Sequence, residues 1–251
     1  MLAITAIYVA TVTPGHAFMP DDFAGYVMHA ANLSVGRPYI EIHYVFNPDA
    51  ISLAPAHGYP PIYPMILAPV YKMSGLNLRP LKIITVLCFA VFMIAFSRLF
   101  EETIPQWAIA VLIFLLGLNI AFWEHRDYLM SEFPYLMFSF CALLVAEKAY
   151  KTLDPRSWRV SDALLLSLLL YATYGTRTIG VVMLPALVAA DIWKFRRPSR
   201  FLIVVVIFTL SFIFLQNILI ASPKDYINAV SFSARSIWVH LAFYGKTLSH
   251  A

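Results

Sequence analysis

Long apolar segments separated by short polar connections constrain this chain more than any other feature. A helix needs about 20 mostly apolar residues to cross the hydrocarbon core of a bilayer. One apolar segment, residues 161–193, is too long for a single ordinary span. It is interrupted near Gly175-Thr176-Arg177, which indicates a helical hairpin. The sequence therefore predicts an all-α, polytopic transmembrane helical bundle. The other predicted spans are 80–100, 106–123, 128–149 and 201–220.

The remaining segments have a mixed character. Residues 1–12 are apolar but too short to span, and we expect them to be the last part of a first transmembrane helix. Residues 13–79 are predicted to be a long first extracytoplasmic loop with short interfacial helices near 22–33 and 62–73. Residues 80–220 then hold the transmembrane helices, and 221–251 begin a further extracytoplasmic segment. We interpret residues 1–251 as one incomplete domain, the N-terminal fragment of a longer membrane protein.

The positions of the basic residues predict the orientation in the membrane. If residue 13 lies outside and every span crosses, the three short inner loops carry nine of the 18 lysines and arginines, as the positive-inside rule requires. The chain is then an integral, multi-pass membrane protein, and a bacterial inner membrane fits it. A nucleic acid partner is not predicted, because the basic residues flank apolar spans. The nine residues are Arg98, Lys148, Lys151, Arg156, Arg159, Lys194, Arg196, Arg197 and Arg200.

In this orientation several charged residues gather at the outer surface. Asp21 and Asp22 precede a predicted helix near the membrane, where partial desolvation favours a carboxylate that acts as a base. The alternative interpretation is a helix N-cap with a solvated neighbour, and the sequence alone favours that simpler role. A catalytic role for the two aspartates is therefore a hypothesis.

Three further charged residues lie near the outer ends of spans. Asp127 is expected in a loop, whereas Glu132 is expected about one helical turn inside a span, facing either a cavity or a partner such as Arg126. Arg177 lies at the hairpin tip, where a guanidinium suits a phosphate or carboxylate. The alternative for Arg177 is snorkelling to the interface. We predict Asp127, Glu132 and Arg177 as substrate-binding residues.

The aromatic and proline-rich segment 57–64 completes the predicted site. His57 and Tyr59 are placed to cradle a lipid or a sugar, although aromatic residues are also common at membrane interfaces without a ligand. The histidines and carboxylates allow a divalent metal without indicating one, and the sequence identifies no cofactor with certainty. Phosphate-binding glycine motifs are absent from the sequence, which argues against nucleotide hydrolysis.

Four segments, in this order, resemble the GT-C glycosyltransferases in the branch of the protein mannosyltransferases (dolichyl-phosphate-mannose-protein mannosyltransferase type) and the aminoarabinose transferase of lipid A. In the first, Asp22 precedes Tyr26 by four residues, as in the family, and Asp21 sits one place early. The others are similar to the family's proline-rich start of an interfacial helix, its Asp…Ser-Glu segment and its Thr-Arg…Gly stretch. The segments are PDDFAGYVMHAANLSVGRPY at 20–39, GYPPIYPMILAPVYKMSG at 58–75, RDYLMSEFPYLMF at 126–138 and YATYGTRTIGVVMLPAL at 171–187.

The resemblance implies inverting transfer of a sugar from a polyprenyl-phosphate donor to a lipid, glycan or protein acceptor at the extracytoplasmic face. It implies that Asp22 is the general base or orients the acceptor, that Asp127 and Glu132 shape a substrate pocket, and that Arg177 meets the lipid phosphate. Two hypotheses of other classes stay open. One is a transporter or lipid flippase whose path Glu132 and Arg177 line. The other is a non-catalytic membrane subunit that presents 13–79 to a partner.

Overall fold

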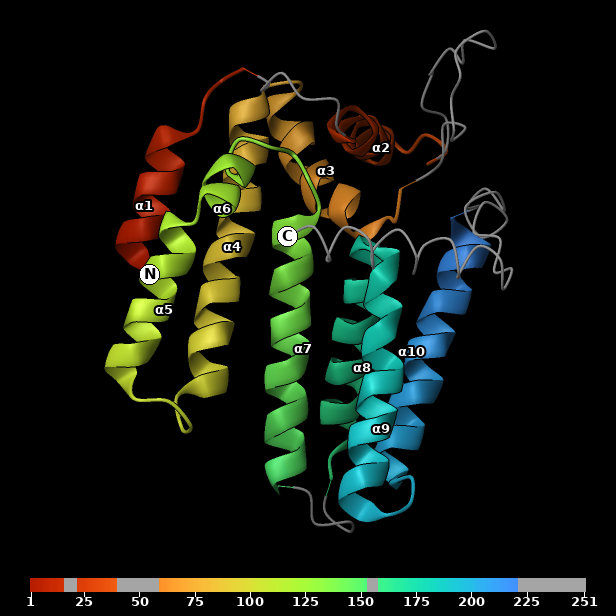
Figure 1. Cartoon of the computed structure of the whole chain (residues 1–251). Coiled ribbons are helices and arrows are strands. Elements are labelled where there is room, and N and C mark those ends of the chain that lie inside the picture. The colour runs from red at the N-terminus through yellow and green to blue at the C-terminus, as the bar shows by residue number, and fades with distance from the viewer. Residues whose placement is uncertain (16–21, 40–58, 153–157, 221–251) are drawn as a thin grey trace, which may run out of the picture.

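The computed structural model describes residues 1–15, 22–39, 59–152 and 158–220, and in these residues the chain forms helices and no strand (Figure 1). The predicted helical class is therefore confirmed for the described part of the chain. In order, the elements are α1 (Leu2–Thr11), α2 (Phe23–Val35), α3 (Ile62–Ser74), α4 (Leu78–Phe100), α5 (Gln106–Leu118), α6 (Ile120–His125), α7 (Glu132–Thr152), α8 (Val160–Thr176), the 3-10 helix η1 (Thr178–Val182), α9 (Met183–Phe195) and α10 (Arg200–Leu219).

The long helices form a bundle that is covered at one end. Figure 1 shows α4, α7, α8, α9 and α10 running along a shared direction, while α2 crosses the end of the bundle and is viewed along its axis. Helix α3 connects these two parts, because it packs against α2, α4 and α8. We call the end beneath α2 and α3 the pocket end. The opposite end is where α4 turns into α5 and α9 turns into α10 (Figure 1).

Aromatic side chains hold α1 and α7 against α4. The ring of Phe89 in α4 stacks on Phe133 in α7, with centroids 4.5 Å apart, and on Tyr8 in α1, with centroids 5.4 Å apart. Further along the same helices, Phe92 meets Phe140 edge to face at 4.8 Å. Offset and edge-to-face rings attract beyond the effect of their buried area. These contacts place the start of α7 beside α4.

Small residues allow a close approach of α8 to α7 and α10. Ala142 and Ala146 in α7 and Ala163 in α8 are buried in one cluster. The hydroxyl of Ser167 in α8 donates to the carbonyl oxygen of Val205 in α10 over 3.1 Å. Small side chains and hydroxyls at helix contacts are typical of membrane bundles, because backbones can then approach closely.

Three helices are long and apolar enough to cross a membrane, which indicates a membrane protein. They cover Leu78–Phe100, Thr178–Phe195 and Arg200–Leu219. The hairpin predicted over 161–193 is confirmed, since α8 ends at Thr176 and α9 follows after η1. The segments Gln106–Leu118 and Val160–Thr176 are apolar helices too short to meet that criterion alone.

Two predicted spans have different limits in the structure. The predicted helix 106–123 is divided, because Asn119 adopts an extended conformation, ends α5 and caps α6 by accepting from the backbone N–H of Ala121 over 2.9 Å. An Asn side chain competes with the backbone for hydrogen bonds and so favours caps over helix interiors. The span predicted from residue 128 begins at Glu132 instead. Glu132 is therefore the first residue of α7 and does not lie one turn inside a helix.

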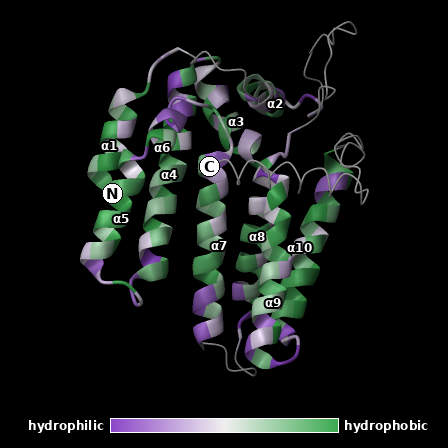
Figure 2. Ribbon diagram, in the orientation of Figure 1, coloured by the Kyte–Doolittle hydropathy of each residue, from purple (hydrophilic) through white to green (hydrophobic). Residues whose placement is uncertain are grey.

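Hydropathy varies along the bundle as a membrane protein requires. Figure 2 shows hydrophobic colour along the middle of the long helices and hydrophilic colour towards their ends. The end opposite the pocket carries Arg98, Lys151, Arg159, Lys194 and Arg196, and we call it the basic end. The predicted segment 221–251 lies outside the described residues.

Candidate functional site

A small pocket opens at the pocket end of the bundle. Its volume is about 130 Å³, and four segments meet around it: the start of α2, the residues before α3, the turn before α7 and the junction of α8 with η1. Three residues predicted from the sequence, Asp22, Tyr59 and Arg177, therefore lie together although they are far apart in the chain. The lining residues are Asp22, Tyr26, Tyr59, Pro60, Met130, Ser131, Thr176, Arg177, Thr178 and Ile179.

The carboxylate of Asp22 is turned towards the pocket and does not cap the helix with its side chain. Asp22 occupies the N-cap position of α2, but its side chain accepts no capping hydrogen bond. Its Oδ1 atom instead accepts a hydrogen bond from the hydroxyl of Tyr59 over 2.7 Å. The simpler interpretation is thus confirmed for the position of Asp22 at the N-cap, while its side chain makes no capping hydrogen bond. The carboxylate keeps accepting capacity on its other oxygen.

Gly25 is required for the position of Tyr59. A Cβ atom at Gly25 would lie 2.2 Å from an atom of the Tyr59 ring, which is closer than such atoms approach in proteins. The ring also packs on Tyr26, with centroids 4.6 Å apart. The missing side chain at residue 25 thus lets the Tyr59 ring lie on α2, where its hydroxyl reaches Asp22.

Tyr26 and Ser131 form the floor between Asp22 and the start of α7. The hydroxyl of Tyr26 donates to the Oγ atom of Ser131 over 3.0 Å. Burial raises the pKa of Tyr26 to about 12, while the hydrogen bond with Ser131 acts in the opposite direction. Tyr26 is therefore a neutral hydroxyl at physiological pH and cannot serve as a base.

Arg177 is paired with Glu132 but keeps donors for a ligand. Its Nη1 atom donates to Oε1 of Glu132 in an ion pair that joins the hairpin tip to the start of α7. Within the described residues, Oε2 of Glu132 is buried without a hydrogen-bond partner. The side chain of Arg177 is 40% exposed, so its fork is accessible from the pocket. An arginine held on one side in this way can bind an oxyanion with its remaining donors.

The backbone around Arg177 is positioned by the end of α8. Arg177 is extended, with φ −145° and ψ 128°, and its N–H donates to the carbonyl oxygen of Thr173 over 3.1 Å. Gly180 packs so closely on this turn that a Cβ atom would lie 2.7 Å from the backbone of Thr173. The helix break therefore aims the arginine side chain towards Glu132 and the pocket.

Asp127 lies in a different cluster and does not line the pocket. Its Oδ1 atom is 3.3 Å from Nζ of Lys82 and accepts from the N–H and the hydroxyl of Thr13, and its Oδ2 atom is 3.3 Å from Nη2 of Arg126. The Lys82 side chain is fully buried in α4 and also donates to the carbonyl oxygens of Thr13 and Gly15. Both carboxylate oxygens of Asp127 are thus occupied by protein partners, and its substrate-binding role stays a prediction.

Opposing influences act on the pKa of Asp127. Burial, the largest single influence, raises it, whereas the hydrogen bonds from Thr13 and the charge of Lys82 lower it. The net result is a pKa below the ordinary value of 3.8. Asp127 is therefore ionised at neutral pH, as an ion pair with buried Lys82 requires.

Two predicted site residues, Asp21 and His57, lie outside the described residues. Among the residues that the structure describes, no group of three or more His, Cys, Asp and Glu side chains is arranged to hold a metal ion. A divalent metal therefore has no identified ligand set in that part of the chain.

Sequence reasoning missed several residues of the two clusters. Ser131, Thr176 and Thr178 line the pocket, but a hydroxyl in an apolar sequence gives no signal by itself. Lys82 carried a usable signal, because a lysine within a transmembrane segment is costly unless it has a partner. Its partner Asp127 was visible in the sequence, but the pairing was not.

Comparisons of the chain with protein-family models, with curated proteins and with solved structures find no match.

Proposed function

We propose that the chain is the catalytic membrane part of a GT-C type glycosyltransferase, with the active site in the pocket between Asp22 and Arg177. The observation that carries this proposal is a carboxylate and a guanidinium lining one pocket at the end of an apolar helix bundle. Such a site is suited to a substrate with a phosphate and hydroxyl groups at its polar end and a hydrocarbon tail. A polyprenyl-phosphate sugar has that composition, and a lipid, glycan or protein supplies the acceptor hydroxyl.

The proposed reaction needs one base and one group that stabilises the leaving phosphate. Asp22 takes the proton of the acceptor hydroxyl while the acceptor oxygen attacks the anomeric carbon of the donor sugar. The bond between that carbon and the phosphate oxygen breaks, and the phosphate leaves with the electron pair. Arg177 offsets the charge that develops on the phosphate. Attack opposite the leaving group inverts the anomeric carbon.

Two neighbours prepare these groups in the proposal. The Tyr59 hydroxyl holds one oxygen of Asp22, so the carboxylate meets the acceptor in a fixed orientation. Glu132 holds one edge of Arg177 in an ion pair, which orients the guanidinium beside the pocket. In a bacterial inner membrane, the positive-inside rule would place the pocket on the extracytoplasmic face.

The test is sugar transfer in membranes that contain the full reading frame, offered a panel of labelled polyprenyl-phosphate sugars. Asp22→Asn is expected to reduce transfer by about 10²–10⁴-fold, the usual contribution of a general base. The matched control is Asp162→Asn, because Asp162 is an exposed aspartate in the first turn of α8, at the basic end. Both variants must insert at wild-type levels.

The outcomes separate the functional classes. Transfer by the wild type and by Asp162→Asn, but not by Asp22→Asn, supports the proposal. Unchanged transfer by Asp22→Asn rejects Asp22 as the base. Lipid movement without transfer of any sugar rejects the enzyme and supports the flippase hypothesis instead.

A further inference from the structure

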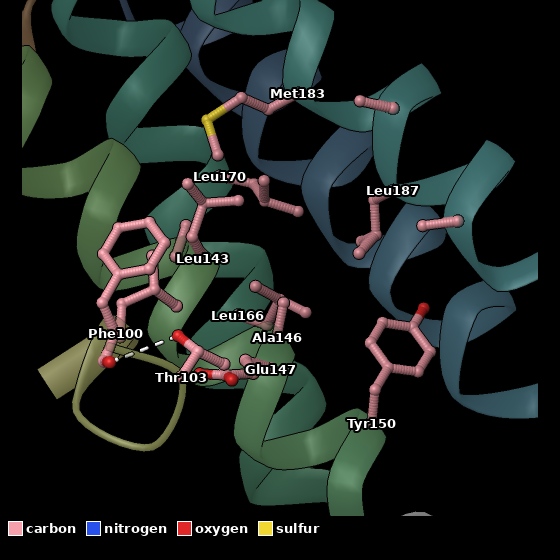
Figure 3. A pocket seen from close by; sticks show the side chains of 14 residues that line it. Phe100, Thr103, Leu143, Ala146, Glu147, Tyr150, Leu166, Leu170, Met183 and Leu187 are labelled. Atoms are coloured by element: carbon pink, nitrogen blue, oxygen red, sulfur yellow. Dashed lines mark hydrogen bonds between the residues drawn. The ribbon is translucent and has the colours of Figure 1, made fainter. Parts of the chain in front are cut away.

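A second, larger cavity lies near the basic end of the bundle, between α4, α7, α8 and α9 (Figure 3). Its volume is about 440 Å³, within the range of sites that hold small molecules. Figure 3 shows that its lining is mostly apolar, with Leu143, Leu170, Met183 and Leu187 around it. The cavity is therefore suited to hydrocarbon and not to a polar ligand.

The cavity exists because small residues line two helices across from one another. Ala142 and Ala146 in α7 are one turn apart, as are Ala186 and Ala190 in α9, and all four line the cavity. Helix α9 packs on α10 and η1, whereas α7 packs on α4 and α8. An empty apolar cavity forfeits dispersion contacts and does not attract water. In a bilayer, the apolar groups that surround the protein and can occupy such a cavity are the acyl chains of lipids.

The polar groups on the rim of the cavity lie at the basic end. The Thr103 hydroxyl donates to the carbonyl oxygen of Phe100, as Figure 3 shows. The hydroxyl of Tyr150 donates to buried Asp191. From Tyr150 to Ala142 the lining follows α7 for about 12 Å at 1.5 Å per residue. Half of the hydrocarbon core of a bilayer is about 15 Å thick. The lining of the cavity on α7 thus extends over most of the thickness of one leaflet.

One lysine, Lys194, lies beside the cavity lining at Tyr150, and the one carboxylate of the lining, Glu147, is paired with Lys151. The Nζ atom of Lys194 donates to the carbonyl oxygen of Tyr150 and lies 5.4 Å from the ring centroid of Phe195. Arg196 and Arg197 follow in the α9–α10 turn. Such a basic turn attracts the phosphate of an anionic headgroup.

We propose that this cavity holds one hydrocarbon chain of an anionic phospholipid from the leaflet at the basic end, with its headgroup beside Lys194 at the end of α9. The lipid fills the space between α7 and α9 and thereby holds α9 in place. This role is independent of sugar transfer at the other end of the bundle.

The experiment uses the purified full chain in phosphatidylcholine vesicles that contain phosphatidylglycerol with a photoreactive diazirine on its acyl chain. Labelled residues are located by mass spectrometry of peptides. We expect labels on cavity residues such as Leu143 and Leu187, and about tenfold less label in Ala186→Phe, because the phenyl ring occupies the space of the chain. The control Ala189→Phe adds the same ring on an exposed residue of α9 that does not line the cavity.

A second filling variant, Ala190→Phe, keeps the test decisive if Ala186→Phe does not fold. Parallel vesicles carry the diazirine on phosphatidylcholine, and weaker labelling there is expected. The proposal is overturned by equal labelling from both lipids or by unchanged cavity labelling in the filling variants. Sugar transfer is not the readout, so the two proposals fail separately.

Discussion

At the scale of single residues, the absence of a side chain at Gly25 decides how closely Tyr59 approaches Asp22. The tyrosine ring occupies the space of the missing Cβ atom, and from that position its hydroxyl donates to the carboxylate of Asp22. A glycine in a helix costs about 1 kcal/mol relative to alanine. An alanine at residue 25 therefore tests two opposing effects. Helix preference predicts a gain in the free energy of unfolding, whereas tertiary packing predicts a loss.

Gly25→Ala is expected to lower the free energy of unfolding by about 1–3 kcal/mol, because overpacking outweighs the gain in helix preference. The measurement is the detergent-induced unfolding of the purified protein, followed by circular dichroism. Gly15→Ala is the control, since a Cβ atom at Gly15 meets nothing within 4 Å. A Gly25→Ala protein more stable than wild type would contradict the packing argument.

At the scale of elements, one buried lysine joins three segments. Lys82 in α4 binds the chain that follows α1 through Thr13 and the chain between α6 and α7 through Asp127. Both segments lead to the pocket end of the bundle. A buried charge is tolerated only while its partners are in place. The cluster therefore supports the site without lining it.

Lys82→Met is expected to lower the free energy of unfolding by about 3 kcal/mol. This value is at the lower end of the range for a broken buried ion pair, because Arg126 still contacts Asp127. The double variant Lys82→Met/Asp127→Asn should recover part of this loss of stability. Unfolding measurements on the wild type, both single variants and the double variant give the coupling energy between the two residues. Lys151→Met is the control, because Lys151 pairs with Glu102 and Glu147 at the exposed surface. Additive effects of the two cluster substitutions would refute the coupling.

The same cluster predicts a dependence of stability on pH. Because the pKa of Asp127 is lower in the folded protein, its ionisation stabilises the fold above pH 3.8, and the contribution is lost as the pH falls through the folded pKa. The difference in free energy of unfolding between wild type and Asp127→Asn should therefore shrink below pH 3.8. Unfolding curves at a series of pH values measure this difference. A difference that does not change with pH would show that the charge of Asp127 does not contribute to the stability of the fold.

At the scale of the whole molecule, charge and hydropathy divide the bundle into two ends. The pocket end holds Asp22, Glu132 and Arg177, and the basic end holds the short turns rich in lysine and arginine. Figures 1 and 2 show the two ends of the bundle. The positive-inside rule then assigns the two ends to opposite sides of the membrane.

A membrane-impermeant maleimide tests this orientation on intact cells. Leu76→Cys lies between α3 and α4 at the pocket end and replaces a side chain that is 69% exposed, so we expect it to be labelled. Glu102→Cys lies in the α4–α5 connection and should be labelled only after the cells are permeabilised. The native thiols interfere little, because Cys88 is buried and Cys141 is partly buried. The reverse pattern would invert the topology.

Local signals in the sequence determined the helical class, the positions of most helices and the break at the hairpin tip. Apolar segment length, charge placement and the polar interruption at Arg177 depend only on neighbours in the chain, so they can be read without coordinates. The same reasoning placed Asp22, Tyr59 and Arg177 among the site residues. It misplaced the start of α7, and it did not foresee the break at Asn119, because helix limits depend on capping contacts.

Only the tertiary structure decided which polar groups meet. The pairing of Arg177 with Glu132, the pairing of Lys82 with Asp127 and the approach of Tyr59 to Asp22 all join segments that are distant in the chain. Charge type and spacing leave such pairings open, because several partners satisfy the same composition. Packing of α4, α7 and α8 selects among them, since a carboxylate and a cation can pair only where the helices bring them within reach.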